Sequence, residues 1–363
     1  MKKIIAIVAS LVLVTGVSFA APKGKAGAFI GLAMPETHVE RWQKDGAALL
    51  SDALAKGYKA EVAYGDADQA KQNQQIQDFL TKGAKLLVVG SVNEGVVSAV
   101  ADAAKDGTIV IAYDRLITGS KDYDYYITFD NYKVGQFQGK AIETALNLAK
   151  ATKAQPKYIT LFAGSPTDNN AKVFFDGAID VLRPYVTSGA LVIVGPAPLK
   201  SSDAAFTKIT TENWRADIAK TRMENLLNND AKKVTLDAIL APNDTLARAI
   251  IEACASDAKY TKKLPVVTGQ DGEVASIAAI RDGKQNMTVF KDTRKLASAT
   301  IDLADALLQG KTPNIAGARL DTTSYDTGKK KVKAYLLEPV IVNKDNWKAI
   351  MVDSGYYKAA DIK

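Results

Sequence analysis

The feature that most constrains the fold is a regular alternation between short apolar runs rich in valine and isoleucine and longer segments of helical period. Apolar runs of about four to eight residues between polar or glycine-containing segments are typical of buried strands, and apolar residues recurring every three or four positions are typical of helices. Strands that alternate with helices form βαβ units with parallel strands. We therefore predict an α/β fold with parallel sheets.

Two series of such units are expected along the chain. In the first series the predicted strands are 28–34, 60–64, 86–90 and 109–113, and the predicted helices are 40–56, 69–82 and 94–105. In the second series the predicted strands are 158–162, 191–194, 238–241 and 266–268, and the predicted helices are 172–182, 216–227, 246–255 and 274–281. Because four or so units already fill one lobe, two sheets of similar size are predicted rather than one continuous sheet.

Two polar stretches, 196–213 and 312–333, lack clear periodicity and are predicted to be long loops, which are usually functional or mobile. The run 329–331 is three lysines without interleaved aromatic residues, and we interpret it as a solvated surface turn. The 47 Lys+Arg exceed the 40 Asp+Glu and give a net charge of +7, but the charges are scattered along the chain. Nucleic acid is therefore not an expected partner.

The first residues have the pattern of a secretory signal. Three residues that include two lysines precede an apolar run at 4–17, and small residues follow it before Pro22. The apolar run is shorter than the ~20 residues of a membrane-spanning helix. We predict a signal peptide at 1–20, cleavage after Ala20 or Ala21, and a periplasmic protein. No cysteine follows the predicted cleavage site, so lipid attachment there is not expected.

One cysteine and one histidine exclude several classes of site. A single Cys forms no intrachain disulfide, and a single His forms no histidine pair for a metal, so neither a metal nor another cofactor is expected. His38 could act as a general base, but no Gly-x-Ser-x-Gly motif supplies a nucleophile for it. A hydrolase built on His38 is therefore disfavoured.

Polar and indole side chains follow the predicted strands. In open α/β sheets ligands bind beyond the carboxyl ends of the strands. The residues at these ends are Glu40-Arg41-Trp42, Tyr113-Asp114-Arg115, Ser165 to Asn170, Asn243-Asp244, Gly269-Gln270-Asp271 and Phe290-Lys291-Asp292. They combine carboxylates, amides, guanidinium groups and an ammonium with an indole, and Trp214 supplies a second indole.

This mixture of groups is what a sugar ring requires. Its hydroxyls both donate and accept hydrogen bonds, and its C–H faces pack on flat aromatic rings. Asp114 is expected to pair with Arg115, and Asp271 with Lys291, which limits the cost of burying these charges. Asp244 is predicted to be a helix N-cap rather than a ligand contact. The set as a whole predicts a carbohydrate site.

Several of these stretches also resemble a known family. The resemblance is carried by Glu40 to Asp45, Ala112 to Leu116, Thr128 to Asn131, Gly164 to Ala171, Gly269-Gln270-Asp271 and Phe290-Lys291. They resemble the periplasmic xylose-binding and multiple-monosaccharide receptors of bacterial ABC importers. The resemblance runs from about residue 28 to the Gly355-Tyr356-Tyr357 stretch, and the segment 196–213 is longer than the family leads us to expect.

The resemblance implies a type I periplasmic binding protein, with two Rossmann-like lobes joined by a three-segment hinge. It implies that Trp42 and Trp214 stack on the sugar. Residues implied to hydrogen-bond its hydroxyls are Arg41, Asp114, Arg115, Asp168, Asn170, Asn243, Asp271 and Lys291. The expected lobes are 25–130 with 292–315 and 131–291 with 316–363, with crossings near 130–131, near Asp292 and within 312–331.

The expected function is capture of one monosaccharide, with xylose first and glucose or another aldose second, and its delivery to a membrane ABC permease. A monomer is expected, and a chemoreceptor or sensor kinase is a further expected partner. A sugar hydrolase using Asp114 and Asp271 is the main alternative. It is disfavoured because both carboxylates are expected to have a cationic neighbour, whereas a general acid needs a raised pKa. A sugar-responsive repressor is disfavoured because a secretory signal stands where a helix-turn-helix would.

Overall fold

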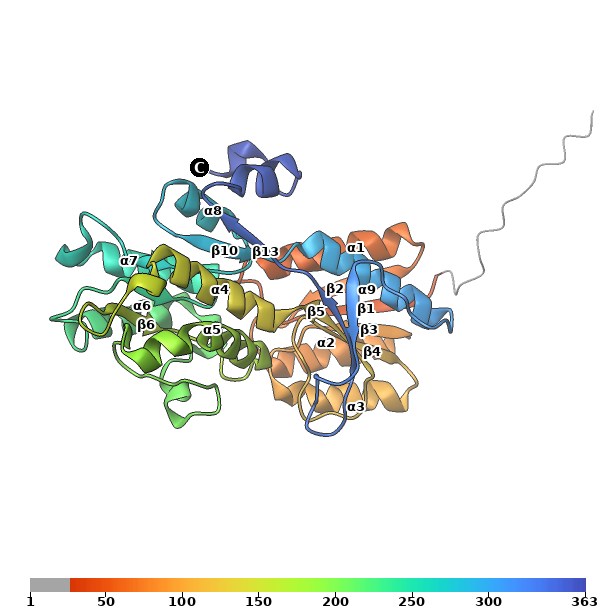
Figure 1. The fold of residues 1–363 in the computed structure, drawn as a ribbon. Coiled ribbons are helices and arrows are strands. Elements are labelled where there is room, and N and C mark those ends of the chain that lie inside the picture. Colours follow the sequence, from red (N-terminus) through yellow and green to blue (C-terminus); the bar gives the residue numbers. More distant parts are fainter. Residues whose placement is uncertain (1–26) are drawn as a thin grey trace, which may run out of the picture.

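The structure is a computed structural model that describes residues 27–363. The predicted signal peptide at 1–20 and its cleavage site near Ala20 lie outside these residues. Two α/β halves lie side by side (Figure 1). We call the half built on the seven-stranded sheet the first lobe, and the half built on the four-stranded sheet the second lobe. The predicted α/β class is confirmed.

The first lobe is a seven-stranded sheet in the order β11-β12-β5-β4-β3-β1-β2. Its strands are β1 Phe29–Met34, β2 Lys59–Tyr64, β3 Leu86–Val89, β4 Ile109–Tyr113, β5 Tyr125–Phe129, β11 Ala318–Asp321 and β12 Lys333–Leu337. All neighbours are parallel except β11 and β12. Its helices are α1 Arg41–Ala55, α2 Gln69–Thr81, α3 Val97–Lys105 and α9 Thr293–Leu308. Helices cover both faces, so every residue of β3 is buried.

The second lobe has a parallel sheet in the order β7-β6-β8-β9. Its strands are β6 Lys157–Leu161, β7 Leu191–Ile193, β8 Ala238–Leu240 and β9 Val266–Val267, and its helices are α4 Asn131–Ala145, α5 Asn169–Ser188, α6 Ala216–Asn228, α7 Asp244–Ala255 and α8 Val274–Arg281. Strands β10 Met287–Phe290 and β13 Val340–Asn343 form an antiparallel pair. A single bridge from Gln270 to Val289 joins this pair to the end of the parallel sheet.

The eight predicted strands and seven predicted helices are all found, with shifted ends. The sheets are not of similar size, because β5, β11 and β12 also join the first. The predicted helix 172–182 is part of the longer α5, which continues through Pro184 to Ser188. Proline usually ends a helix, but here the interior residues of α5 are held by apolar packing on the second-lobe core.

The third passage between the lobes differs from expectation. We expected it within 312–331, with residues 316–363 in the second lobe. Instead β12 pairs in parallel with β5, and β11 pairs with β12, so both strands belong to the first sheet. The chain leaves this sheet at Glu338 and Pro339, directly before β13. The other two passages follow β5, at Asp130, and β10, at Lys291 and Asp292.

The stretch 196–213 is better ordered than its polar composition predicts. It contains the 3₁₀ turn Ala204–Lys208, and its end overlaps the turn Glu212–Trp214. Phe206 and Ile209 are buried in the core of the second lobe, where Phe206 packs on Phe175 with ring centroids 5.1 Å apart. The stretch therefore has a fixed course that ends at Trp214.

Helices α4 and α5 approach each other at glycine positions. A Cβ atom on Gly135 would lie 1.9 Å from the carbonyl oxygen of Phe174, and one on Gly177 would lie 2.2 Å from that of Tyr132. Both positions therefore exclude any larger residue without a shift of the backbone. Helix α4, which follows the passage at Asp130, therefore packs tightly on α5. Within residues 27–363 no helix is both long and apolar enough to span a bilayer.

Candidate functional site

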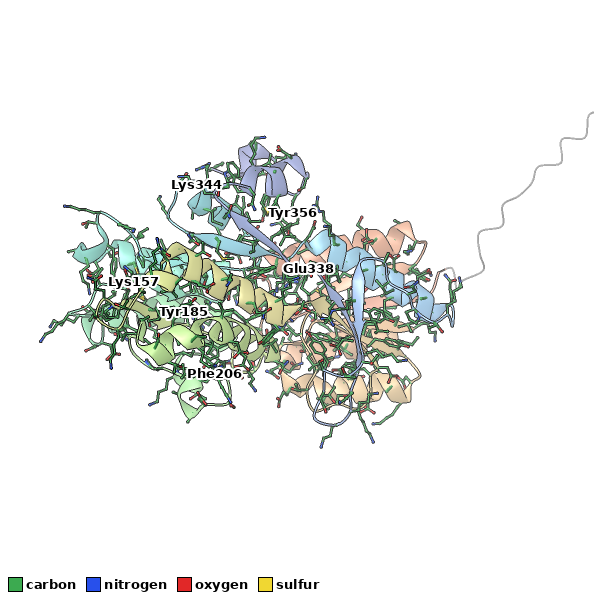
Figure 2. All side chains as sticks on the ribbon, viewed as in Figure 1. Lys157, Tyr185, Phe206, Glu338, Lys344 and Tyr356 are labelled. Carbon is green, nitrogen blue, oxygen red and sulfur yellow. The ribbon has the colours of Figure 1, made fainter. Side chains whose placement is uncertain are left out.

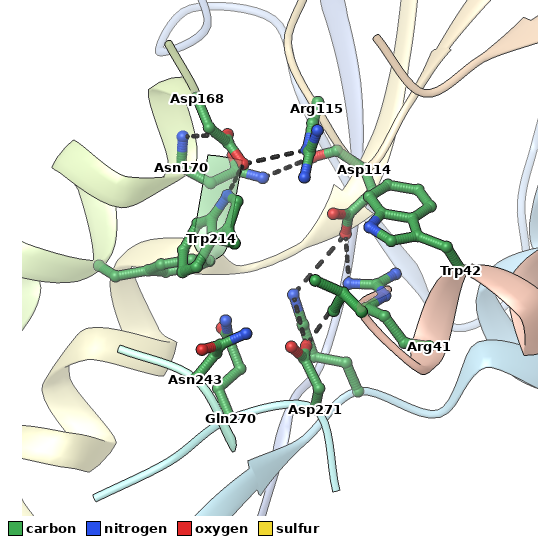
Figure 3. A pocket seen from close by; sticks show the side chains of 13 residues that line it. Arg41, Trp42, Asp114, Arg115, Asp168, Asn170, Trp214, Asn243, Gln270 and Asp271 are labelled. Carbon is green, nitrogen blue, oxygen red and sulfur yellow. Dashed lines mark hydrogen bonds and ion pairs between the residues drawn. The ribbon is translucent and has the colours of Figure 1, made fainter. Parts of the chain in front are cut away.

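A small cavity lies between the two lobes, at the carboxyl ends of their parallel strands (Figure 3). It is lined by Val39, Arg41, Trp42, Asp114, Arg115, Asp168, Asn170, Phe174, Trp214, Asn243, Gln270, Asp271 and Lys291. All ten predicted site residues are among them.

Helix α1 begins with two of the lining residues. Arg41 donates from Nε to Asp45 at 2.9 Å and from Nη1 to Asp114 at 3.0 Å. Tyr113 bonds the other oxygen of Asp45, so the guanidinium is fixed by groups buried beneath it. Trp42 is only 2% exposed, and the guanidinium groups of Arg41 and Arg115 each lie 5.0 Å from its ring centroid. Figure 3 shows Trp42 and Trp214 on opposite sides of the cavity, as stacking on two faces of a ring would require.

Two carboxylates share two cations at the floor of the cavity. Lys291 Nζ lies 3.2 Å from Asp271 Oδ1 and 3.8 Å from Asp114 Oδ1, and Arg41 Nη1 lies 3.7 Å from Asp271 Oδ1. Burial raises the pKa of Asp114, but Arg41 and Lys291 outweigh burial and hold that pKa below its usual value. Asp114 is therefore an ionised acceptor, unsuited to the role of general acid.

A second ion-pair group lies on the opposite wall. Arg115 Nη2 donates to Glu36 at 2.6 Å, and its Nε lies 3.1 Å from Asp168 Oδ2. Trp214 Nε1 donates to the same oxygen of Asp168 at 3.3 Å. Burial raises the pKa of Asp168, and Arg115 opposes this. Because Lys291 Nζ lies 3.2 Å from Asp271 Oδ1, the predicted pairing of these two residues is confirmed. That of Asp114 with Arg115 is wrong, because each bonds a partner from a different segment.

Asn170 connects the two lobes beside the cavity. Its Nδ2 donates to the carbonyl oxygen of Asp114 at 2.7 Å, and its Oδ1 accepts from Asn131 Nδ2 at 2.9 Å. Tyr126 donates to the same oxygen at 3.2 Å. Asn170 therefore holds the backbone of Asp114 in place as well as lining the cavity.

The start of α7 corrects one prediction. Asn243, not Asp244, is the N-cap residue, since its Oδ1 accepts from the amide of Leu246 at 3.1 Å. The same residue also lines the cavity. Asp244 is fully buried behind it and accepts from the amide of Glu273 at 2.9 Å and from Thr288 at 2.9 Å. Burial and the nearby Glu273 raise the pKa of Asp244 well above its usual value.

Three of the lining residues have left-handed backbone conformations that non-glycine residues rarely adopt. The φ angles are 56° at Asp114, 54° at Trp214 and 95° at Asp271. Such conformations persist where the surrounding structure imposes them, and they concentrate at binding sites. A close glycine contact also fixes Trp214, because a Cβ on Gly164 would lie 2.0 Å from Trp214 Cη2.

The charges on the cavity wall balance. Three cations, from Arg41, Arg115 and Lys291, face three carboxylates, from Asp114, Asp168 and Asp271. Four buried side-chain atoms of the lining residues have no hydrogen-bond partner among residues 27–363. Arg115 Nε and Asp271 Oδ1 still lie in ion pairs, which leaves Arg41 Nη2 and Gln270 Oε1 without a partner of either kind. Buried polar groups are normally satisfied. The cavity therefore offers a donor and an acceptor, without net charge, to a polar ligand.

Three lining residues were not among those predicted: Val39, Phe174 and Gln270. Gln270 lies beside Asp271 in a stretch that was recognised as a strand end. Phe174 is four residues after Asn170 and so lies on the same face of α5, which helical spacing could have indicated. Its ring centroid is 5.4 Å from Lys291 Nζ. Val39 lies in the turn before α1, where its carbonyl oxygen accepts from the amide of Trp42 at 3.2 Å.

His38 does not line the cavity. Its Nε2 lies 2.9 Å from the carbonyl oxygen of Asn213 and 3.0 Å from Glu36 Oε2, so it faces acceptors rather than a nucleophile. No group of three or more His, Cys, Asp or Glu side chains suited to a metal ion is found in the part of the chain that the structure describes.

Two lobes of parallel strands, joined by three passages and enclosing a polar cavity, define the type I periplasmic binding protein class. A sequence profile described as the periplasmic binding protein domain matches residues 30–312. The chain belongs to this family.

Two relatives and one solved structure illustrate the likeness. The chain is 42% identical over 370 residues to the multiple sugar-binding periplasmic receptor ChvE of Rhizobium radiobacter, covering 100% of both chains. It is 34% identical over 362 residues to the D-xylose-binding periplasmic protein of Escherichia coli, covering 99% of each. An ABC transporter solute-binding protein from Clostridium phytofermentans with bound β-D-glucose superimposes with a TM-score of 0.85 at 39% identity, over 92% of this chain and 100% of that one.

Proposed function

We propose that this protein is a periplasmic receptor that binds one neutral monosaccharide in pyranose form between its lobes and delivers it to a membrane ABC importer. The observation that carries the proposal is the composition of the cavity wall: three cations, three carboxylates, and two indoles on opposite sides. Charge-assisted hydrogen bonds are about twice as strong as neutral ones, and the indoles suit the C–H faces of the ring. A charged ligand would leave one of these buried groups without its counter-ion.

Binding is proposed to close the two lobes around the sugar. Arg41, Trp42, Asp114 and Arg115 belong to the first lobe, and the other polar lining residues belong to the second lobe or its passage. A ligand that contacts both sets stabilises the closed state by its differential affinity. The proposed hinge points are the passages at Asp130, at Asp292 and at Glu338, with 27–130 and 292–337 moving against 131–291 and 338–363.

D-xylose and D-glucose are the proposed ligands. The Escherichia coli relative is named for D-xylose, and the Clostridium phytofermentans structure holds β-D-glucose. The two sugars carry the same ring hydroxyls at C2, C3 and C4, and glucose adds a hydroxymethyl group at C5. An added group of this kind is discriminated by local space rather than by unpaired partners, so a site that holds the shared hydroxyls can accept both.

A thermal-shift panel on the mature protein tests the proposal. The panel contains D-xylose, D-glucose, D-galactose and L-arabinose, with D-glucuronate and D-glucosamine as charged analogues of glucose. A ligand at 100 times its Kd adds ~2.7 kcal/mol to the free energy of unfolding. We expect xylose or glucose to raise the Tm and both charged analogues to leave it unchanged. A Tm that no neutral sugar raises, or that glucuronate raises most, contradicts the proposal.

The proposed role is capture without bond cleavage. A hydrolase using Asp114 and Asp271 would need one of them protonated, and both lie between the cations of Arg41 and Lys291. Release of reducing sugar from aryl glycosides by the purified protein would favour the hydrolase instead. Secretion to the periplasm is part of the proposal, supported by the signal-like residues 1–20 and by the relatives' periplasmic names.

A further inference from the structure

A contact between the lobes lies outside the cavity and involves Glu40, the residue before α1. Glu40 occupies the N-cap position of α1, yet its side chain makes no capping bond to that helix. Its Oε2 accepts instead from the amide of Val274, the first residue of α8, at 3.3 Å. Its Oε1 lies 3.0 Å from the hydroxyl of Tyr357. A carboxylate of the first lobe therefore caps a helix of the second.

Helix α8 takes this capping acceptor from the other lobe. The first amides of a helix have no partner within the helix and are usually capped by a preceding side chain. The residue at the N-cap position of α8 is Glu273, and its carboxylate is used elsewhere, accepting from Thr245 at 2.7 Å and pairing with Arg248 at 2.5 Å. Glu40 therefore supplies the side-chain acceptor for α8 that Glu273 does not supply.

Tyr357 brings the C-terminal segment into the same contact. Its ring is 8% exposed and packs with Ile277, Phe290 and Met351 in a cluster of the second lobe. Its hydroxyl lies 2.9 Å from the carbonyl oxygen of Gly272, the residue after Asp271, so it can donate to either Gly272 or Glu40. Lys44 of α1 lies 4.7 Å from the ring centroid. Residue 357 is beyond the region 30–312 that the family profile matches.

The neighbouring Tyr356 reaches the first lobe at the second passage. Its ring packs edge-on against Phe290 with centroids 4.7 Å apart, its hydroxyl lies 3.1 Å from Thr293 Oγ1, and the Arg294 guanidinium lies 5.0 Å from its centroid. Thr293 and Arg294 are the first residues of α9 in the first lobe. Figure 2 labels Tyr356 between the C-terminal segment and the first-lobe helices. The two tyrosines thus link the lobes along one side of the hinge.

We propose that Glu40 and Tyr357 form a latch that holds the closed state and sets the affinity for sugar without touching it. The inference rests on the proposed function. Opening the lobes would separate Glu40 from Tyr357 and from the start of α8, and closing would restore both contacts. The apparent Kd is the intrinsic Kd divided by the fraction of protein that is in the closed state. A weaker latch lowers this fraction and therefore raises the apparent Kd. Glu40 adjoins Arg41, and Gly272 adjoins Asp271, so latch and ligand act on the same two segments.

The test compares Tyr357→Phe and Glu40→Gln with the wild type and with Tyr185→Phe. Tyr185 is a matched control because its hydroxyl bonds Glu143 Oε1 at 2.5 Å with both residues inside the second lobe. We expect Tyr357→Phe to raise the Kd for D-xylose and for D-glucose by the same factor, about three- to tenfold, through faster dissociation. The double variant should lose less affinity than the sum of the two single losses, because both single variants affect the Glu40–Tyr357 contact. Tyr185→Phe should bind as the wild type does.

The outcomes separate the latch from the proposed function. If the wild type binds sugar and Tyr357→Phe binds equally well, the latch is wrong and the receptor function stands. If the loss of affinity differs between xylose and glucose, Tyr357 acts in sugar recognition and the latch is again wrong. Tyr357 also bonds Gly272 inside the second lobe, so a sugar-free Tm that falls while the Kd for both sugars keeps its wild-type value would show a purely structural role and overturn the latch. Absence of sugar binding by the wild type overturns both proposals.

Discussion

The substitution Asp114→Asn tests the charge balance of the cavity most directly. Asp114 is 4% exposed and lies 3.0 Å from Arg41 Nη1 and 3.8 Å from Lys291 Nζ. Asparagine keeps the volume and tolerates the φ of 56° at this position, so the change is one of charge rather than of backbone conformation. It leaves three cations facing two carboxylates on the cavity wall.

The size of the effect depends on the ion-pair partners that Arg41 and Lys291 keep in the variant. Removing one member of a buried pair costs ~3–5 kcal/mol where the other charge is left alone. Arg41 keeps Asp45 at 2.9 Å, and Lys291 keeps Asp271 at 3.2 Å, so the loss in the free energy of unfolding should fall below that range. A hydrogen bond to a charged group contributes ~1.5–3 kcal/mol, which predicts a rise in sugar Kd of roughly 10- to 150-fold.

Isothermal titration calorimetry of Asp114→Asn with D-xylose and D-glucose measures this change, and a melting curve without sugar checks the fold. Asp217→Asn is the matched control, since Asp217 pairs with Arg215 at 2.6 Å on the exposed surface of the second lobe. The control should bind as the wild type does. Unchanged affinity in Asp114→Asn would refute the assignment of Asp114 to the ligand, and with it the argument from charge balance.

Three further outcomes are expected. Gly164→Ala should raise the sugar Kd at least about tenfold by calorimetry, because its new Cβ would overlap Trp214, 2.0 Å away, and displace the indole. Burial raises the pKa of Asp321, but bonds from two backbone amides prevail and lower it to about 2. Its stabilising effect is therefore present above the unfolded value of ~3.9, and the stability gap between wild type and Asp321→Asn, measured by urea unfolding, should close as pH falls towards 2. Burial raises the pKa of the Cys254 thiol to about 12, so Ellman's reagent should react with it only in denaturant.

Much of the fold could be predicted because local patterns determine it. Strands such as β1 and β4 are continuous apolar runs, and glycines at positive φ, such as Gly57 and Gly83, follow the helices between them. The cavity residues were predictable for a related reason. Parallel strands place their carboxyl ends at one edge, so polar residues far apart in sequence, such as Asp114 and Asp271, are brought together.

The pairing of the late strands could not be predicted from local patterns. β12 joins β5 across about 200 residues, and β11 alternates little because its side chains are half-buried or exposed. The sequence therefore predicts a loop here, and it predicts the third passage earlier in the chain than the structure has it. Which side chains form ion pairs inside the cavity likewise depends on the tertiary structure and not on the local sequence. Asp114 and Arg115 are adjacent in sequence, but they face Arg41 and Glu36 on different segments.

The glycine contacts between α4 and α5 bear on how a rotation at the hinge would reach the cavity. α4 starts directly after Asp130, and α5 starts with residues that line the cavity, among them Asn170. With backbones this close at Gly135 and Gly177, the two helices have no room to slide past each other. In the proposed closure, a change of angle at Asp130 would therefore move Asn170 together with α4, and α4 and α5 would rotate as one rigid unit.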